Sequence, residues 1–159
     1  MLQIIKIDKT EEFPKLVPEK LFIDFLYNHL GKYKDTKQDI TKAINYAFSE
    51  ENGKGGFIII AMQEGKTIGG AVVNKTGMSG YIPNYILVYI VSHNGYRRKG
   101  VGKKILQHVL DECNYDVALH VEPDNHAREL YKKMGFNSKY IEMRCKKKKP
   151  LFPPKINMR

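Results

Sequence analysis

The chain has 159 residues, 42% of them hydrophobic, and a formal net charge of +10. This length and apolar share favour one soluble globular domain over a disordered or multidomain chain. No apolar run is long enough to cross a bilayer, and the first residues alternate like a strand and unlike a signal peptide. Cys113 and Cys145 fit no metal or redox spacing. We therefore expect a cytoplasmic protein with no membrane contact and no metal.

The positive charge is concentrated in two places. One basic cluster lies at 97–104, and the other is the run from Lys146 to Lys149. Such charge suits a phosphate-bearing partner, including nucleic acid. Aromatic residues do not interleave with these clusters, as a single-strand binding platform would require. A nucleic-acid partner is therefore the less favoured interpretation.

The first half of the chain predicts a strand, two helices and a hairpin. Apolar residues recur at helical spacing in two segments, and Gly31 is a typical stop for the first. Thr36 and Asp39 resemble a capping arrangement at the start of the second. The expected elements are a strand at 2–7, helices at 18–30 and 36–48, and hairpin strands at 57–63 and 67–74.

The second half predicts an alternation of strands and helices. Its most informative part is the glycine-containing basic turn at 96–104, which joins an apolar strand to an amphipathic helix. The expected elements are strands at 85–91, 117–121 and 140–145, and helices that follow Val101 and Asn125. The three prolines after Lys149 predict an irregular tail.

The basic turn is suited to phosphate because it opens a helix. The first turn of a helix has unpaired N–H groups and the positive end of the helix dipole. Glycine lets this backbone approach a ligand closely. The turn is no P-loop, since Val101 stands where Lys should follow the second glycine. Nor is it a Rossmann fingerprint, because Ile105 occupies the place of the third glycine.

Two ordered motifs resemble the GNAT superfamily of acyl-CoA N-acyltransferases. The first, Arg97-x-x-Gly100-x-Gly102, is similar to that family's Arg/Gln-x-x-Gly-x-Gly/Ala signature. The second runs from Asn125 to Phe136 and is similar to its Asn-x-x-Ala-x-x-x-Tyr-x-x-x-Gly-Phe segment. Both have the strand–turn–helix context that the family requires. Two matches in the right order are much more specific than one.

The resemblance implies an α/β (α+β) fold with a mixed, mostly antiparallel central sheet flanked by helices. Its splayed strands would form the acyl-CoA cleft. We expect one N-acetyltransferase domain at 1–145 and a basic, proline-containing tail at 146–159. The family often ends in two strands, whereas only one is predicted after Phe136. The acceptor site is therefore expected to be open or completed by a second subunit, and a homodimer is one expectation.

The resemblance implies an acetyl-CoA-dependent N-acetyltransferase that transfers acetyl directly to a primary amine. Main-chain groups at the end of the 85–91 strand would hold the pantetheine arm and polarise the thioester carbonyl. Backbone amides and cations of the basic turn would hold the pyrophosphate. The implied cofactor-binding residues are Ile90, Val91, Ser92, Arg97, Arg98, Lys99, Gly100, Val101, Gly102, Lys103, Asn125 and Tyr131.

Tyr131 matches the tyrosine that lies near the cofactor sulfur in this family, so the resemblance implies that it is the general acid. It also lies on an apolar helical face, where it could be a core aromatic. Asn125 could cap its helix as well as contact the cofactor. No acid occurs at 81–91, so His93 is the first candidate for a general base. His120, Glu122 and ordered water are the alternatives.

The sequence does not identify the acceptor. A small-molecule amine and a protein amine both remain open. The expected wall of the acceptor site comes from the first two helices, including Phe25, His29, Tyr33 and Tyr46. The alternative functions are a non-catalytic acyl-CoA-binding sensor and, less favoured, a nucleic-acid or ribosome-binding protein.

Overall fold

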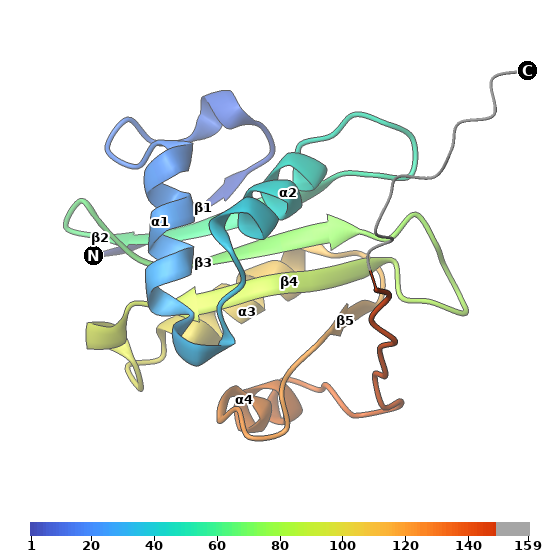
Figure 1. The fold of residues 1–159 in the computed structure, drawn as a ribbon. Coiled ribbons are helices and arrows are strands. Elements are labelled where there is room, and N and C mark those ends of the chain that lie inside the picture. The colour runs from blue at the N-terminus through green and yellow to red at the C-terminus, as the bar shows by residue number, and fades with distance from the viewer. Residues whose placement is uncertain (149–159) are drawn as a thin grey trace, which may run out of the picture.

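The computed structural model describes residues 1–148, which form one five-stranded sheet with helices on both faces (Figure 1). The strands lie in the order β1-β2-β3-β4-β5. Their bounds are β1 Leu2–Ile7, β2 Gly56–Gln63, β3 Lys66–Lys75, β4 Tyr85–Ser92 and β5 Val117–Leu119. The α-helices are α1 Glu19–His29, α2 Lys37–Ala47, α3 Val101–Glu112 and α4 Ala127–Lys133, and short 3-10 turns occur at Thr10–Glu12, Gly31–Tyr33 and Asn94–Tyr96.

The sheet is antiparallel except at one edge. The strands β1 to β4 pair antiparallel along the chain, whereas β4 and β5 pair in parallel. The parallel ladder contains only three residue pairs, from Tyr85↔Val117 to Leu87↔Leu119. The expected fold, with its mixed and mostly antiparallel sheet, is therefore confirmed.

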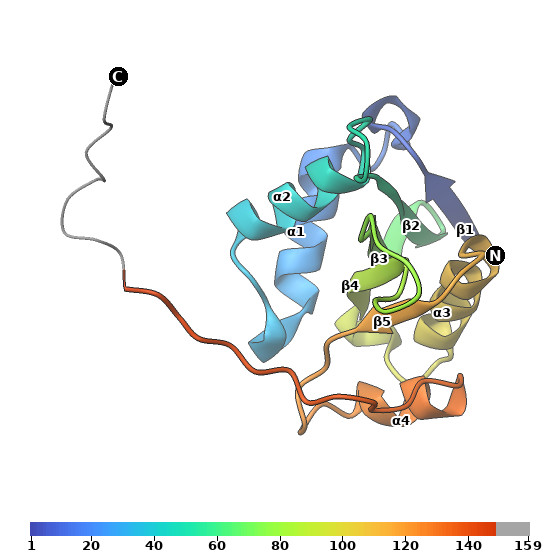
Figure 2. The same cartoon turned by 90° about the vertical axis from the view of Figure 1, so that its right-hand side faces the viewer.

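The helices form two layers that enclose two apolar cores. The helices α1 and α2 cover one face of the sheet, and α3 covers the other, with α4 beside β5 (Figures 1 and 2). The central strands β2 and β3 are buried on both faces, as their continuous apolar sequences require. The apolar stripe of α3, which includes Ile105 and Val109, is fully buried against this sheet.

Two adjacent glycines set how closely the helices approach β3. A Cβ atom on Gly69 would lie 2.4 Å from Ile105 of α3, and one on Gly70 would lie 2.5 Å from Phe22 of α1. Each glycine therefore admits a helix on its own face of the sheet. This close packing fixes the ends of α1 and α3 near the end of β4, where the sequence predicts the site.

The local signals of the first two helices are confirmed. The Thr36 hydroxyl accepts a hydrogen bond from the Asp39 N–H at 3.1 Å, which satisfies one of the free donors at the start of α2. Gly31 has a φ of +63° directly after α1, as the predicted stop requires. Within residues 1–148, no helix is both long and apolar enough to span a membrane.

The strand predicted at 140–145 is wrong. Residues 137–148 form no helix or strand, and the side chains of Tyr140, Ile141 and Met143 are more than three-quarters exposed. The alternating pattern has no ladder to join, because β5 contains only three residues and the chain then turns away toward α4. The predicted domain boundary at residue 145 lies inside this irregular stretch, and residues 149–159 of the expected tail lie outside the described part.

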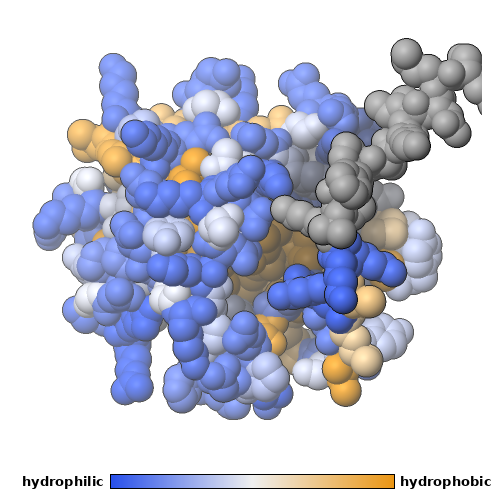
Figure 3. Space-filling model, viewed as in Figure 1, coloured by the Kyte–Doolittle hydropathy of each residue, from blue (hydrophilic) through white to orange (hydrophobic). Residues whose placement is uncertain are grey.

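Figure 3 shows the face that carries α1 and α2. Most of it is hydrophilic, but a hollow with an apolar floor and a hydrophilic rim opens near its centre. The apolar floor indicates that the helices leave part of this face of the sheet uncovered.

Candidate active site

The strands β4 and β5 part at an irregularity in β4. Their last pair is Leu87↔Leu119. At the same point the β3–β4 register shifts and Val88 has no partner on β3. The side chains of Val88 and Tyr89 consequently both pack into the core beneath α1 and α2, although they are consecutive. Such a bulge bends the strand and increases its twist, which opens a gap beside the rest of β4.

The end of β4 directs main-chain groups into this gap. The N–H of His93 donates to the carbonyl of Ile68 on β3 at 2.7 Å. Since backbone groups alternate sides along a strand, the polar groups of Ile90 and Ser92 point away from β3 and toward the gap, while those of Val91 point to β3. Of the three residues expected here, Ile90 and Ser92 therefore have the suitable main-chain orientation.

The chain continues from the gap into the basic turn and α3. Arg98 has a φ of +61° and Gly100 a φ of +81°, so the backbone curls sharply before the helix. Within residues 1–148, no side chain caps the start of α3. The amides of the first turn, at Val101 to Lys103, therefore lack a side-chain acceptor there and lie at the positive end of the helix dipole. This concave group of N–H donors fits a phosphate or pyrophosphate.

Gly102 lies where three elements meet. A Cβ atom built on it would lie 3.5 Å from the Ser92 hydroxyl of β4 and 3.7 Å from Leu130 of α4. These are ordinary contact distances, so a small side chain would fit. The start of α3, the end of β4 and the face of α4 therefore border the same small region.

The cations of the turn have different surroundings. The Arg97 guanidinium donates to the His29 carbonyl at the end of α1 at 3.2 Å. The Lys99 ammonium lies 5.2 Å from the centre of the Tyr96 ring. Arg98 and Lys103 are exposed and make no ion pair within residues 1–148. Arg97 is thus the cation of this turn that already has a main-chain partner.

Tyr131 lies on α4 and faces the core between α4 and the sheet. Its side chain is 8% exposed and packs edge-on against Phe136 at a centroid distance of 6.0 Å. Burial raises the pKa of the Tyr131 hydroxyl to about 12. The residue is therefore part of the core and also a phenol that keeps its proton at neutral pH.

Asn125 has the structural role that its position suggests. Its side-chain oxygen accepts a hydrogen bond from the Ala127 N–H at 2.9 Å, and its carbonyl accepts from the Arg128 N–H at 3.2 Å. Both bonds satisfy donors at the start of α4. The residue thereby fixes the direction of the helix that carries Tyr131.

The candidate bases lie on both sides of the gap. The ring of His93 accepts a hydrogen bond at Nδ1 from the Gly95 N–H at 2.9 Å. His120 has its Nδ1 3.5 Å from the Arg144 guanidinium. Glu122 is exposed in the segment that follows β5. The lone pair of His93 that accepts from Gly95 is not free for a substrate proton.

Side chains from distant segments contact one another on the α1 and α2 side of β4. The Tyr89 hydroxyl, on β4, donates to Asp35 at 2.6 Å. Across the gap, the Lys32 ammonium lies 2.5 Å from the Asp124 carboxylate, which also accepts from Tyr33 at 3.4 Å. The loop between α1 and α2 therefore contacts both β4 and the segment after β5.

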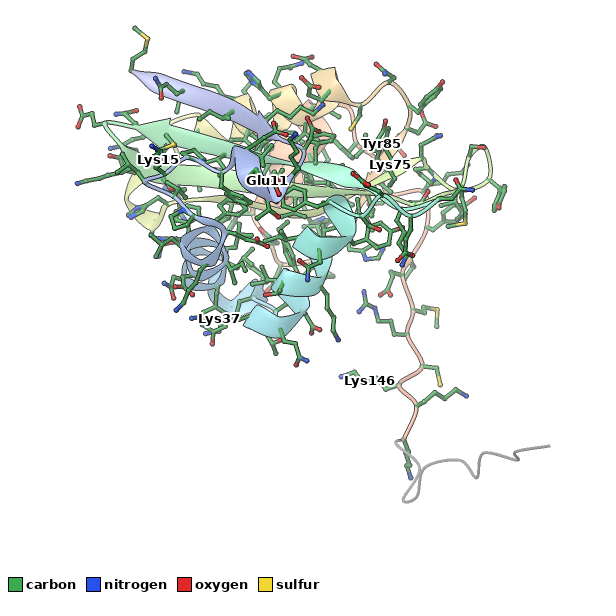
Figure 4. All side chains as sticks on the ribbon, turned by 90° about the horizontal axis from the view of Figure 1, so that it is seen from above. Glu11, Lys15, Lys37, Lys75, Tyr85 and Lys146 are labelled. Atoms are coloured by element: carbon green, nitrogen blue, oxygen red, sulfur yellow. The ribbon has the colours of Figure 1, made fainter. Side chains whose placement is uncertain are left out.

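Tyr46, expected in the acceptor wall, lies elsewhere. Its hydroxyl donates to the carbonyl of Lys75 at 2.8 Å, at the opposite end of β3 from the basic turn. Figure 4 shows Lys75 beside Tyr85 at that end. A hollow of about 590 Å³ also lies there, lined among others by Lys75, Asn84, Tyr85 and Tyr115. No residue of either sequence motif borders this hollow, so its volume does not locate the active site.

Residues 54–138 match the family model of the acetyltransferase (GNAT) domain, which is more than half of the chain. The chain belongs to the GNAT acetyltransferase family. The matched segment contains the basic turn, the gap and α4. No curated protein sequence matches at a significant level.

Solved structures share the GNAT fold along nearly the whole chain. Aminoglycoside N-acetyltransferase AAC(6')-Iy in complex with CoA has a TM-score of 0.65 at 17% identity, covering 92% of this chain and 95% of its own. A GNAT-family acetyltransferase from Streptococcus pneumoniae has a TM-score of 0.63 at 17% identity, covering 94% and 100%. The ribosomal-protein-S18-alanine N-acetyltransferase from Escherichia coli has a TM-score of 0.61 at 20% identity, covering 86% and 78%.

Sequence reasoning named Tyr33 but missed the other polar side chains on the α1 and α2 side of the gap. Asp35 and Asp124 belong to no motif, and they lie far apart in the chain. The bulge after Leu87 also left no signal in an apolar strand. Alternation along β4 would have placed Tyr89 on the opposite face, because only the extra residue at Val88 returns it to the side of α1 and α2.

Proposed function

We propose that this GNAT domain transfers an acetyl group from acetyl-CoA to a primary amine. The observation that carries the proposal is the parting of β4 and β5 at Leu87, directly beside gap-facing main-chain groups and the uncapped start of α3. These features match a ligand with an amide-containing arm and a diphosphate. The family supports acyl transfer, and AAC(6')-Iy, with CoA bound, supports the choice of donor.

The proposed cofactor contacts are mainly main-chain contacts. The amides from Val101 to Lys103 would hold the diphosphate, and Arg98 and Lys103 would add charge. The gap-facing groups of Ile90 and Ser92 would pair with the amides of the pantetheine arm. This geometry explains why apolar side chains suffice on this strand.

Acetyl-CoA supplies the thioester that is cleaved. Gap-facing N–H groups of β4 would polarise its carbonyl as the amine nitrogen forms a bond to the carbonyl carbon. The C–S bond breaks, and Tyr131 would donate its phenolic proton to the departing sulfur. The high pKa of Tyr131 ensures that the proton is present at neutral pH. The proton lost by the amine passes to ordered water in this scheme, because His93 uses its Nδ1 lone pair for Gly95. Water would return a proton to the Tyr131 phenolate, which restores the general acid.

The acceptor would approach from the face of α1 and α2, opposite the start of α3. Tyr33, Asp35 and Tyr89 offer hydroxyl and carboxylate groups on that face. Such groups suit an amine that carries further donors or a second positive charge. A small-molecule amine, as in the aminoglycoside acetyltransferases, and a protein amine both fit this description.

Two measurements test the proposal. Isothermal titration calorimetry with acetyl-CoA at modest ionic strength should show binding, and a panel of small amines and peptides should identify acceptors through release of free thiol. Binding without acceptor-dependent thiol release would favour an acyl-CoA sensor. Absence of binding would overturn both functions. A salt titration with nucleic acid covers the remaining alternative, since such affinity falls steeply with salt.

A further inference from the structure

Two histidines connect α1 to the cofactor loop. The rings of His29, at the end of α1, and His93, just after β4, lie 4.2 Å apart between centroids. The N–H of Asn94 donates to Nδ1 of His29 at 3.2 Å, and the N–H of Gly95 donates to Nδ1 of His93 at 2.9 Å. We call these two rings and the two amides the histidine clasp. Successive amides at the start of the loop are therefore each held by an imidazole.

These hydrogen bonds fix the protonation of both rings. A backbone amide always donates, so Nδ1 of each ring must be unprotonated. The proton of the neutral imidazole then lies on Nε2. A second proton on either ring would occupy Nδ1. That nitrogen could then no longer accept the hydrogen bond from the backbone N–H. The clasp therefore exists only while both rings are neutral.

The surroundings of His29 disfavour a positive charge on its ring. Phe25 packs against both rings, at centroid distances of 4.6 Å from His29 and 6.4 Å from His93, and Tyr96 contacts His93 edge-on at 5.6 Å. Burial lowers the pKa of His29, and His93 and the Arg97 guanidinium lower it further, while the side chain of Asn94 partly opposes them. The facing charged groups are Arg97, from the loop, and Lys99, above Tyr96. In the described chain, no carboxylate pairs with either ring.

Only a few residues separate the histidine clasp from the proposed diphosphate site. Arg97 continues the same connection by donating to the His29 carbonyl, and the uncapped start of α3 follows Gly100. We propose that His29 and His93 are positioning residues that hold the cofactor loop in its binding geometry, and that protonation of either ring releases the loop. This inference rests on the proposed binding of acetyl-CoA.

Asparagine separates the hydrogen bond from the charge. Its side-chain oxygen can take the place of Nδ1 as an acceptor, but it does not titrate. The test measures the Kd for acetyl-CoA by calorimetry at about pH 7.5 and about pH 5, for wild type, His29→Asn, His93→Asn, the double variant and the two alanine variants. His108→Asn is the matched control, because His108 is exposed on α3, outside the clasp.

For one linked proton, affinity falls about tenfold for each pH unit below the pKa of the group. At the lower pH we expect wild type and His108→Asn to bind acetyl-CoA several-fold more weakly than the double asparagine variant does. At the higher pH the three proteins should bind it with equal affinity. The alanine variants should bind weakly at both. Wild type and variants are compared at the same pH, so the titration of the ligand phosphates affects all of them equally. Parallel pH profiles for wild type and the double asparagine variant would overturn the clasp, whereas no binding by wild type at either pH would overturn the proposed function instead.

Discussion

The two sides of the gap between β4 and β5 are built from different groups. On the side of α3, the candidate site consists mainly of main-chain amides, from the end of β4 to Lys103. On the side of α1 and α2, it consists of side chains from separate segments, such as Asp35, Tyr89 and Asp124. One side depends on backbone conformation and the other on residue identity.

This difference suits a protein with two ligands, a cofactor that many proteins share and an acceptor that is particular to this one. A backbone site tolerates many substitutions, provided that the few residues fixing its conformation remain. A side-chain site changes whenever one of its residues changes. The cofactor side is therefore expected to respond mainly to changes in backbone geometry, and the acceptor side to loss of single polar groups. The predictions below test this contrast.

Tyr131→Phe tests the one side chain on the cofactor side to which we assign chemistry. Loss of the general acid should lower kcat about a hundredfold, because positioned proton transfer contributes at this scale. The Kd for acetyl-CoA should stay within about twofold, since the ring and its packing remain. Steady-state thiol release and calorimetry give the two values.

Tyr115→Phe is the matched control for Tyr131→Phe, because Tyr115 is 66% exposed and lies at the other end of the sheet. Unchanged kcat in the Tyr131 variant at saturating acetyl-CoA would remove Tyr131 from the chemistry. The chemistry proposed for the cofactor side would then depend on main-chain groups alone.

Alkaline unfolding measures the burial of Tyr131 independently of catalysis. Its pKa is raised to about 12 in the folded protein, above the ordinary value of 10. The stability linked to this group is present below pH 10 and is lost as the pH rises toward 12. At about pH 11 the loss should be about 1 kcal/mol. Urea unfolding of wild type and Tyr131→Phe at about pH 9 and 11 checks this.

A residual loss should remain in the Tyr131→Phe variant. Burial also raises the pKa of Cys113 to about 11, from its ordinary value of 9, so this thiol contributes in the same direction. If wild type and Tyr131→Phe lose equal stability, the hydroxyl of Tyr131 is more accessible than the structure indicates.

Gly100→Val tests the backbone side directly. A branched side chain at a φ of +81° should cost about 1–2 kcal/mol, so the loop should shift and the affinity for acetyl-CoA fall about tenfold. Gly80→Val is the matched control, because Gly80 has a φ of +73°, equally open surroundings, and a position in the β3–β4 loop. Equal effects of the two substitutions on Kd would argue against a role of the backbone at Gly100.

Asp35→Asn and Tyr89→Phe test the acceptor side. Both should raise the KM of the acceptor a few-fold while the Kd for acetyl-CoA stays constant, because their hydrogen bond lies on the face of α1 and α2. A double-mutant cycle on acceptor KM should show that the two effects are not additive. Additive effects would mean that Tyr89 does not position Asp35.

The fold was predicted correctly from local signals, and the prediction of a cofactor side depends on local signals too. Thr36 and Gly31 mark helix ends by their own chemistry, and Gly100 marks a turn that needs a positive φ. The acceptor side depends on how the loop between α1 and α2 meets β4 and the segment after β5. Contacts such as that of Lys32 with Asp124 join residues far apart in sequence, so no local pattern predicts them.

The strand wrongly predicted at 140–145 shows the same limit, because here a local pattern was present but, in the described part of the chain, its tertiary partner was not. Its alternation is a real local signal, yet a strand needs a partner of matching length. The short β5 does not provide one within residues 1–148. Tyr46 is similar, because its helix was predicted correctly while its hydroxyl contacts the far end of β3.

The three-pair ladder between β4 and β5 also determines how the molecule opens. Segments with few backbone hydrogen bonds exchange their amide protons through local fluctuations, well before a buried central strand does. In deuterated water, β5 and α4 should therefore label earlier than β2 and β3. A molecule bound across the gap would hold β5 to β4, so the labelling rate of β5 would fall toward that of the central strands. The slower labelling would report the residence time of the bound molecule without any turnover.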